Sequence, residues 1–174
     1  MVGTRQTDDL AALYAALKGP LCTVALHGTR ERTAAEDVVH DVFARLCREP
    51  HRHAFPSLDD ARRFLARAVF CRVLELRRRR RPEPAPDQAI ERAAAAEVEP
   101  LDRLVAHDEA TRLRAELARL PVPQAEVVVL HLHGGLKFRE IAELLSIPID
   151  TATTRYRTAL QKLSSRLRAA RVEE

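Results

Sequence analysis

Apolar residues recur every three or four positions along most of the chain, the spacing of helices that bury one side. In the N-terminal part this pattern predicts a helix over 7–26 with an interruption at Gly19-Pro20, a helix over 34–48 and a long helix over 58–80. No run alternates strictly between apolar and polar residues, and only five residues are glycine, so no extensive sheet is expected. The pattern predicts an all-α fold.

Side-chain spacing marks where two of these helices begin. Thr33 and Glu36 have the spacing of a capping box, in which the two side chains accept hydrogen bonds from free amides at the helix start. Ser57, with Asp60 three residues on, starts the long helix in the same way.

The second half of the chain is also predicted to be helical. A helix from about 101 to 120 ends at Pro121-Val-Pro123, because proline removes an amide donor. A further helix over 124–133 ends at Gly134-Gly135, because glycine tolerates positive φ.

The stretch FREIAELLSIPIDTATTRYRTAL, 138–160, predicts a helix, a tight turn and a second helix. Each helix has one apolar side at helical spacing. These residues are Phe138, Ile141, Ala142 and Leu145 in the first helix, and Ala152, Tyr156, Ala159 and Leu163 in the second. Asp150 is the expected N-cap of the second helix, its carboxylate accepting from amides two or three residues on.

The solvent side of that second helix carries short hydroxyls and arginines. These residues are Thr151, Thr153, Thr154, Arg155, Arg157 and Thr158, with Lys137 and Arg139 flanking them. Threonines let a helix lie deep in a groove, and arginines bind phosphates or grip guanine. We interpret the stretch as a DNA-binding helix-turn-helix with its recognition helix at 150–168. The alternative is an ordinary helical hairpin with a solvated face.

Charge divides the chain into three parts. Residues 1–81 carry 16 Lys/Arg against 10 Asp/Glu, and residues 101–174 carry 12 against 10. The segment 82–100 carries one against five and holds four prolines. We therefore expect two small basic helical domains, 1–81 and 101–174, joined by an acidic, proline-rich linker. The net charge of +4 indicates an anionic partner.

Other chemistries find little support in the sequence. The three cysteines fall in apolar helical patterns, so buried, reduced thiols are favoured over a disulfide or metal site. The two His-x-His pairs lack the flanking ligands of a metal motif, and no phosphate-binding loop or catalytic signature is present. No apolar segment approaches 18 residues, and no signal core is seen at the N-terminus. We expect a cytoplasmic protein without membrane insertion, cofactor, metal or enzymatic activity of its own.

The long helix 58–80 carries arginines interleaved with an aromatic residue. Arg63, Arg67 and Phe70 share one side at helical spacing, which Arg77 and Arg78 extend. Such a side suits single-stranded DNA, because charge follows the backbone and a ring can stack on a base. The alternative for the arginine run 79–81 is a solvated helix end.

Two motifs in this order resemble the extracytoplasmic-function (ECF) group of bacterial RNA polymerase sigma factors. The first is TAAEDVVHDVFARLCRE, 33–49, which is similar to the acidic helix of that family. The second is LPVPQAEVVVLHLHGGLKFREIAELLSIPIDTATTRYRTALQKL, 120–163. The resemblance covers roughly residues 8–81 and 104–168.

The resemblance implies a protein that binds the polymerase core and directs it to promoters. The first domain would dock on the polymerase clamp helices through Glu36, Asp37, Asp41, Val42 and Phe43. Its long helix would capture the melted −10 strand, the loop 51–57 would receive a flipped base, and the second domain would read the −35 duplex. A local alternative has Glu36 only closing its capping box and Asp41 only pairing with Arg45. An anti-sigma partner is left open.

The sequence departs from the family pattern at several positions. Phe64 stands where the family has a tryptophan, and Cys71 where it has an asparagine, which puts the mode of strand melting in question. Ser146 replaces a common turn glycine, and Thr153 stands where a lysine is frequent. A stand-alone DNA-binding regulator is the alternative function, but it leaves the acidic helix 34–48 without a purpose.

Overall fold

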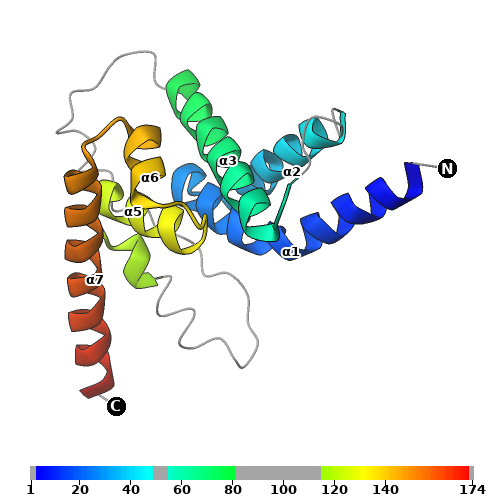
Figure 1. The fold of residues 1–174 in the computed structure, drawn as a ribbon. Helices are drawn as coiled ribbons and strands as arrows, with labels where there is room; N and C mark the ends of the chain where they lie inside the picture. Colours follow the sequence, from blue (N-terminus) through cyan, green and yellow to red (C-terminus); the bar gives the residue numbers. More distant parts are fainter. Residues whose placement is uncertain (1–2, 49–54, 81–114, 173–174) are drawn as a thin grey trace. The chain divides into compact units, whose positions relative to one another are not determined.

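The computed structural model describes residues 3–48, 55–80 and 115–172, and within these ranges the ordered elements are helices without strands. The all-α prediction is confirmed. The helices are α1 (Gly3–Thr29), α2 (Arg32–Arg48), α3 (Leu58–Arg80), α5 (Val122–Leu132), α6 (Phe138–Leu145) and α7 (Ile149–Val172) (Figure 1). A short helical turn at 115–118 comes before α5. The predicted linker 82–100, the loop residues 51–54 and most of the predicted helix 101–120 lie outside the described residues.

The chain divides into two compact units. One comprises Met1–Pro82 together with Val129–Lys137, and the other comprises Glu83–Val128 together with Phe138–Glu174. The first unit therefore includes the last turn of α5 and the segment after it, which the domain boundaries expected from the sequence did not anticipate.

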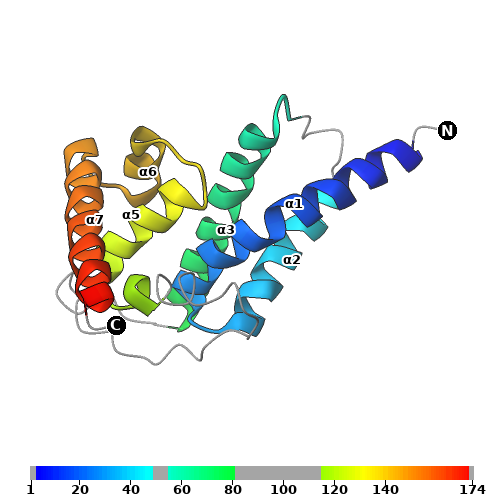
Figure 2. The same cartoon turned by 90° about the horizontal axis from the view of Figure 1, so that it is seen from below.

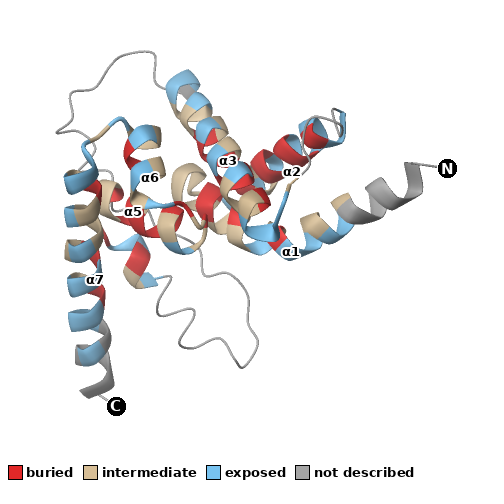
Figure 3. Ribbon diagram, viewed as in Figure 1, coloured by how far each residue is buried: buried red, intermediate tan, exposed pale blue. Residues whose placement is uncertain are grey.

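The core of the first unit forms where α1, α2 and α3 pack against one another (Figures 1 and 2). Its apolar side chains recur at helical spacing on each helix, and Figure 3 shows the buried residues along these helices. Leu21, Val39, Leu65 and Val69 are among those that are fully buried. Each such side chain stabilises the fold by about 1.5–3 kcal/mol relative to an exposed one.

Helix α1 continues through Gly19-Pro20, so the predicted interruption is wrong. A side chain before proline disfavours helix because its Cβ clashes with the proline ring. Gly19 has no Cβ and therefore removes that clash. The Thr23 hydroxyl donates to the Gly19 carbonyl at 3.2 Å within the turn that follows.

The segment Leu10–Thr29 of α1 is long and apolar enough to cross a membrane, contrary to the expectation from the sequence. In the structure, one side of this segment packs against α2 and α3 through Leu17, Leu21 and Val24. A core helix of this composition satisfies the same criterion of length and hydropathy.

The two predicted helix starts have different outcomes. At α3, the Ser57 hydroxyl oxygen accepts from the Asp60 amide at 3.1 Å, as predicted. At α2, the first helical hydrogen bond runs from the Ala35 amide to the Glu31 carbonyl, and the Thr33 hydroxyl donates to the Glu31 carboxylate at 2.6 Å. The predicted capping box is therefore wrong, because a nearby carboxylate binds the threonine.

The cysteine prediction is corrected in part. Cys47 and Cys71 are exposed and Cys22 is half-buried, so the burial expected from the apolar patterns is wrong for two of the three. All three are free thiols. Burial, followed by the charge of Glu36, raises the pKa of the Cys22 thiol. No group of three or more His, Cys, Asp or Glu side chains gathers as a metal site within the described ranges.

The ends of α5 and α6 use left-handed residues. Gly135 has φ of +70°, which confirms the predicted stop after α5. At the end of α6, Ser146 has φ of +54°, its amide bonds the Glu143 carbonyl at 3.3 Å, and the Ile147 amide bonds the Ala142 carbonyl at 3.0 Å. These two bonds form a Schellman motif with serine at the position usually held by glycine. The predicted turn is confirmed.

Candidate nucleic-acid and polymerase interfaces

The turn between α6 and α7 gives the second unit its helix-turn-helix. Ile141 and Ala142 of α6 are buried, as are Ala152, Ala159 and Leu163 of α7. The ring of Phe138 meets the ring of Tyr156 edge to face, with centroids 5.2 Å apart. Leu117, Leu120, Ala125 and Val128 complete the core behind α7. The buried sides predicted for both helices are confirmed.

Helix α7 begins at Ile149, one residue before the expected start, because the Ala152 amide bonds the Pro148 carbonyl at 3.1 Å. Asp150 therefore lies inside the first turn and is not the N-cap. Its carboxylate still lies at the positive end of the helix dipole, where negative charge is favourable.

The predicted recognition residues lie on accessible parts of α7. None of the six is buried, and Thr154 and Arg157 are exposed. The Thr153 hydroxyl donates to the Ile149 carbonyl at 2.9 Å, so its proton is used within the helix. Among the described residues, Arg155 and Arg157 have no hydrogen bond or ion pair, which leaves both guanidinium groups available to an anion.

The flanking cations differ from each other. Arg139 lies 3.4 Å from Glu143, four residues on in α6, and both side chains are well exposed. Such an exposed ion pair contributes little to stability. Arg139 can therefore leave Glu143 and bind a phosphate instead. Lys137 is exposed and lies immediately before α6.

On α3, the aromatic residue predicted to stack on a base is in the core. Phe70 is 2% exposed, so the prediction that it contacts DNA is corrected. Arg77 is part-buried and donates from Nε to the Gly28 carbonyl at 3.1 Å, and Arg63 pairs with Asp60. These two arginines therefore bind the protein itself. The prediction stays untested for all four arginines. Arg67 and Arg78 are exposed and have no partner within the described part of the chain, so they are the more accessible two.

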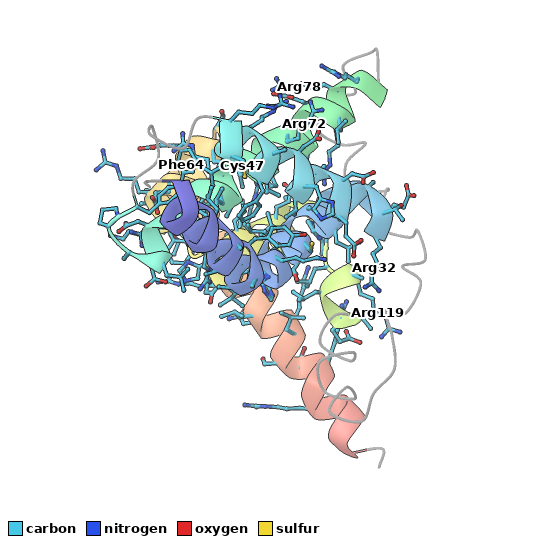
Figure 4. The ribbon with its side chains drawn as sticks, turned by 90° about the vertical axis from the view of Figure 1, so that its right-hand side faces the viewer. Arg32, Cys47, Phe64, Arg72, Arg78 and Arg119 are labelled. Carbon is cyan, nitrogen blue, oxygen red and sulfur yellow. The ribbon has the colours of Figure 1, made fainter. Side chains whose placement is uncertain are left out.

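The exposed side of α3 follows a different set of positions. It carries Phe64, Arg67, Cys71, Glu75 and Arg78, at intervals of three, four, four and three residues. Phe64 and Arg78 are labelled in Figure 4. Phe64 is 43% exposed, and its ring lies 5.4 Å from that of Phe55. Phe64 is thus the aromatic residue that can stack on a base. Its place at the family's tryptophan position was the signal that could have identified it.

Next to Phe64, the groove between α2 and α3 forms a pocket of about 380 Å³. Its lining combines apolar side chains with two arginines. The residues are Val42, Arg45, Leu46, Arg48, Phe64, Leu65 and Ala68. An apolar floor with cations beside it suits a group that is planar and apolar on one side and anionic on the other, such as an unpaired nucleotide.

Arg62, on the adjacent part of α3, was not among the predicted site residues. Its Nε donates to the His133 carbonyl at 2.8 Å and its Nη2 to the Leu132 carbonyl at 2.5 Å, within the first unit. A cation at the carbonyl end of a helix complements the helix dipole. Arg62 and its two acceptors are 70 or more positions apart, so the helical periodicity of the sequence could not predict these bonds.

The predicted polymerase-binding residues of α2 separate by exposure. Val42 and Phe43 are 8% and 6% exposed, so their prediction as contact residues is corrected: they hold α2 in the core. Glu36 pairs with Arg32 at 3.1 Å, which replaces the capping role considered for it. Asp37 is exposed and has no ion pair or hydrogen bond among the described residues.

Asp41 pairs across helices rather than along its own. Its Oδ2 lies 3.3 Å from Arg72 Nη2 of α3, so the alternative in which Asp41 pairs with Arg45 is wrong. Arg72 also bonds Glu75 at 2.9 Å. The hydrogen bond from Arg72, followed by the charges of Arg72, Arg45 and Arg79, lowers the pKa of Glu75.

At the start of α3, the hydrogen bond from Ser57, followed by the charge of Arg63, lowers the pKa of Asp60. The charge of Lys137 acts in the same direction.

Comparison with known proteins identifies relatives of both halves. The sequence family described as "Sigma-70, region 4" matches residues 110–170. The chain is 29% identical over 174 residues to "Probable ECF RNA polymerase sigma factor SigI" of Mycobacterium tuberculosis strain H37Rv, covering 97% of this chain and 59% of that protein. It is 30% identical over 139 residues to "ECF RNA polymerase sigma factor RpoE" of Cereibacter sphaeroides, covering 74% of this chain and 70% of the relative.

Among solved structures, the fold is similar to the sigma factor RpoE crystallised with the anti-sigma factor NepR from Bartonella quintana. The TM-score is 0.64 at 16% identity, over 93% of this chain and 96% of that one. This likeness supports the all-helical fold.

Proposed function

The chain belongs to the extracytoplasmic-function group of RNA polymerase sigma factors, and from this membership we propose that it binds core RNA polymerase and directs it to specific promoters. Members of this family are transcription initiation factors, and we assign this chain no catalysis of its own. The observation that carries the proposal is the pair Arg155 and Arg157, which have no partner among the described residues and lie beside threonines on the accessible side of α7. A helix so equipped can read the edges of a −35 duplex.

The first unit supplies the other two contacts in this proposal. On α2, Asp37 and Asp41 present carboxylates to a basic surface of the polymerase. On α3, Phe64 stacks on a base of the melted −10 strand while Arg67 and Arg78 follow its phosphates. This assignment moves the stacking role from Phe70 to Phe64, because Phe64 is the exposed ring.

The chain spans 59% of the length of the M. tuberculosis relative, so the partners and location of the whole protein are part of the proposal. We place it in the cytoplasm, where core polymerase and promoter DNA are found. The B. quintana relative was crystallised with an anti-sigma factor, and this supports proposing a partner of that kind here as well.

Run-off transcription with purified bacterial core polymerase on a genomic promoter library tests the proposal. The full chain should direct initiation at a defined set of promoters that core alone does not use. Absence of both core binding and promoter-directed initiation would refute it.

Replacing a recognition arginine tests the role of α7. Arg155→Ala should reduce discrimination between a native and a scrambled −35 element by about 1–3 kcal/mol, the usual value of a bidentate guanine contact. Arg168→Ala is the matched control, because Arg168 is an exposed arginine near the far end of the same helix, thirteen residues from Arg155 and outside the predicted contact residues. Transcription is compared at matched core occupancy. Equal use of native and scrambled elements by the unmodified chain would show that α7 reads no sequence.

A further inference from the structure

One ion-pair network joins α2 to α3 in the first unit. Arg72 of α3, labelled in Figure 4, contacts Asp41 of α2 through Nη2, at 3.3 Å, and donates through Nη1 to Glu75, at 2.9 Å. The Arg72 side chain is 17% exposed, whereas those of Asp41 and Glu75 are 56% and 51% exposed. Arg72 is therefore the inner member of the network, and the two carboxylates are its solvent-facing partners. Both raise the pKa of Arg72, Glu75 first.

The two carboxylates are not equivalent. Glu75 lies one helical turn from Arg72 and also feels the positive charges of Arg45 and Arg79. Asp41 comes from the other helix, and Arg72 is its sole ion-pair or hydrogen-bond partner in the described part of the chain. Asp41 can therefore leave Arg72 without leaving the guanidinium uncompensated, because Glu75 keeps it neutralised.

Arg72 is also incompletely bonded. Its Nε is buried and has no hydrogen-bond acceptor among the described residues. A buried donor without an acceptor costs free energy. Of the two carboxylates, Glu75 makes the shorter bond to Arg72, at 2.9 Å, and Asp41 makes the longer one, at 3.3 Å.

We propose that Arg72 is an internal competitor for Asp41, one of the carboxylates with which α2 contacts the polymerase. On binding, Asp41 exchanges Arg72 for a cation of the polymerase, while Glu75 retains Arg72 on α3. The inference rests on the proposed function, in which α2 is the polymerase-binding helix. Asp37 has no partner in the described ranges of the chain and makes its contact without such an exchange.

The proposal predicts changes of opposite sign for the two partners of Arg72. Arg72→Gln frees Asp41 and should tighten binding of the full chain to core polymerase about two- to fivefold, since a part-exposed ion pair is worth at most about 1 kcal/mol. Glu75→Gln leaves Asp41 as the remaining partner of Arg72 and should weaken binding. Arg168→Gln, which removes one exposed positive charge from the other unit, should leave the dissociation constant unchanged.

The measurement is fluorescence anisotropy of labelled full-length chain titrated with core polymerase, with a thermal melt of each variant as the folding control. If Arg72 only supports the fold, Arg72→Gln lowers the melting temperature and weakens binding, as does Glu75→Gln, and the inference is wrong. If Arg72→Gln does not fold, Arg72→Lys is used, because its single ammonium competes less well for Asp41 and should still tighten binding.

A double-mutant cycle isolates Asp41 as the route of the effect. In an Asp41→Asn background, Arg72→Gln should no longer change the affinity for core. Tightening that persists there would overturn the inference. Failure of the unmodified chain to bind core would refute the proposed function, whereas normal core binding that is insensitive to Arg72→Gln would refute the exchange alone.

Discussion

Gly28, in the last turn of α1, is predicted to be difficult to replace, because it lies against α3. A Cβ at this position would lie 2.1 Å from Val73 Cγ1 and 3.3 Å from Val73 Cβ. Carbon atoms in contact prefer about 3.5–4.0 Å. The valine side chain is short and branched and is fully buried, so it cannot swing away, and the α1–α3 contact itself must open.

Two opposing terms set the size of the effect of Gly28→Ala. Alanine gains about 1 kcal/mol over glycine in a helix. Overpacking of a core contact costs about 1–3 kcal/mol, and more where the backbone must move. The short contact indicates the upper end of that range, so we expect a net loss of about 1–2 kcal/mol. A unit of this size should then melt about 4–8 °C lower for each kcal/mol lost.

The assay is urea and thermal unfolding of the full chain followed by circular dichroism. The control is the double variant Gly28→Ala/Val73→Ala, in which the added methyl fills the space left by the valine. Its loss should be smaller than the sum of the two single losses. Unchanged or increased stability of Gly28→Ala, or strict additivity in the double variant, would refute the packing argument.

Three further outcomes are expected. Ser146→Gly should raise the unfolding free energy by about 1 kcal/mol, because serine is held at positive φ, and a lower denaturation midpoint would contradict this. Asp37→Arg should weaken core binding with a nearly unchanged melting temperature, since Asp37 is exposed and unpaired within the described residues, so unaltered affinity would remove it from the interface. The lowered pKa of Asp60 stabilises the fold above the unfolded-state value of about 3.9. Asp60→Asn should therefore be destabilising at pH 7, the difference from the unmodified chain should shrink as pH falls below that value, and a pH-independent difference in acid titration would exclude the charge as its cause.

The sequence predicted those features that depend on spacing within one helix. The buried side of α6 and α7, the Ser57 cap and the glycine stop after α5 are of this kind. Local competition was harder to predict, as when the Glu31 carboxylate bound the hydroxyl of Thr33. At Gly19-Pro20, the absence of a Cβ allowed the helix to continue where proline alone predicted a break.

The site itself was predicted only where its residues follow from one helical face. On α3, the side predicted to face DNA was the one that contains Phe70. That side faces the core, and the exposed side is the one that contains Phe64. The bonds of Asp41 to Arg72, and of Arg77 to the Gly28 carbonyl, join residues that are 31 and 49 positions apart. Only the packing of three helices brings them together, so no local pattern could have shown them.

Several arginines of α3 bind other groups of the protein, and this affects how strongly α3 would bind DNA of arbitrary sequence. Arg63, Arg72 and Arg77 bind carboxylates or a carbonyl. On the side of α3 that carries Phe64, Arg67 and Arg78 are exposed and have no partner among the residues that the structure describes. Attraction to arbitrary DNA grows with the number of phosphates neutralised, and proteins with about 6–10 such contacts are held strongly at low salt. A genome offers about 10⁶–10⁹ competing sites. With two such cations on this side, α3 by itself would hold arbitrary DNA only weakly and would not keep the chain on bulk chromosome, away from a scarce pool of polymerase.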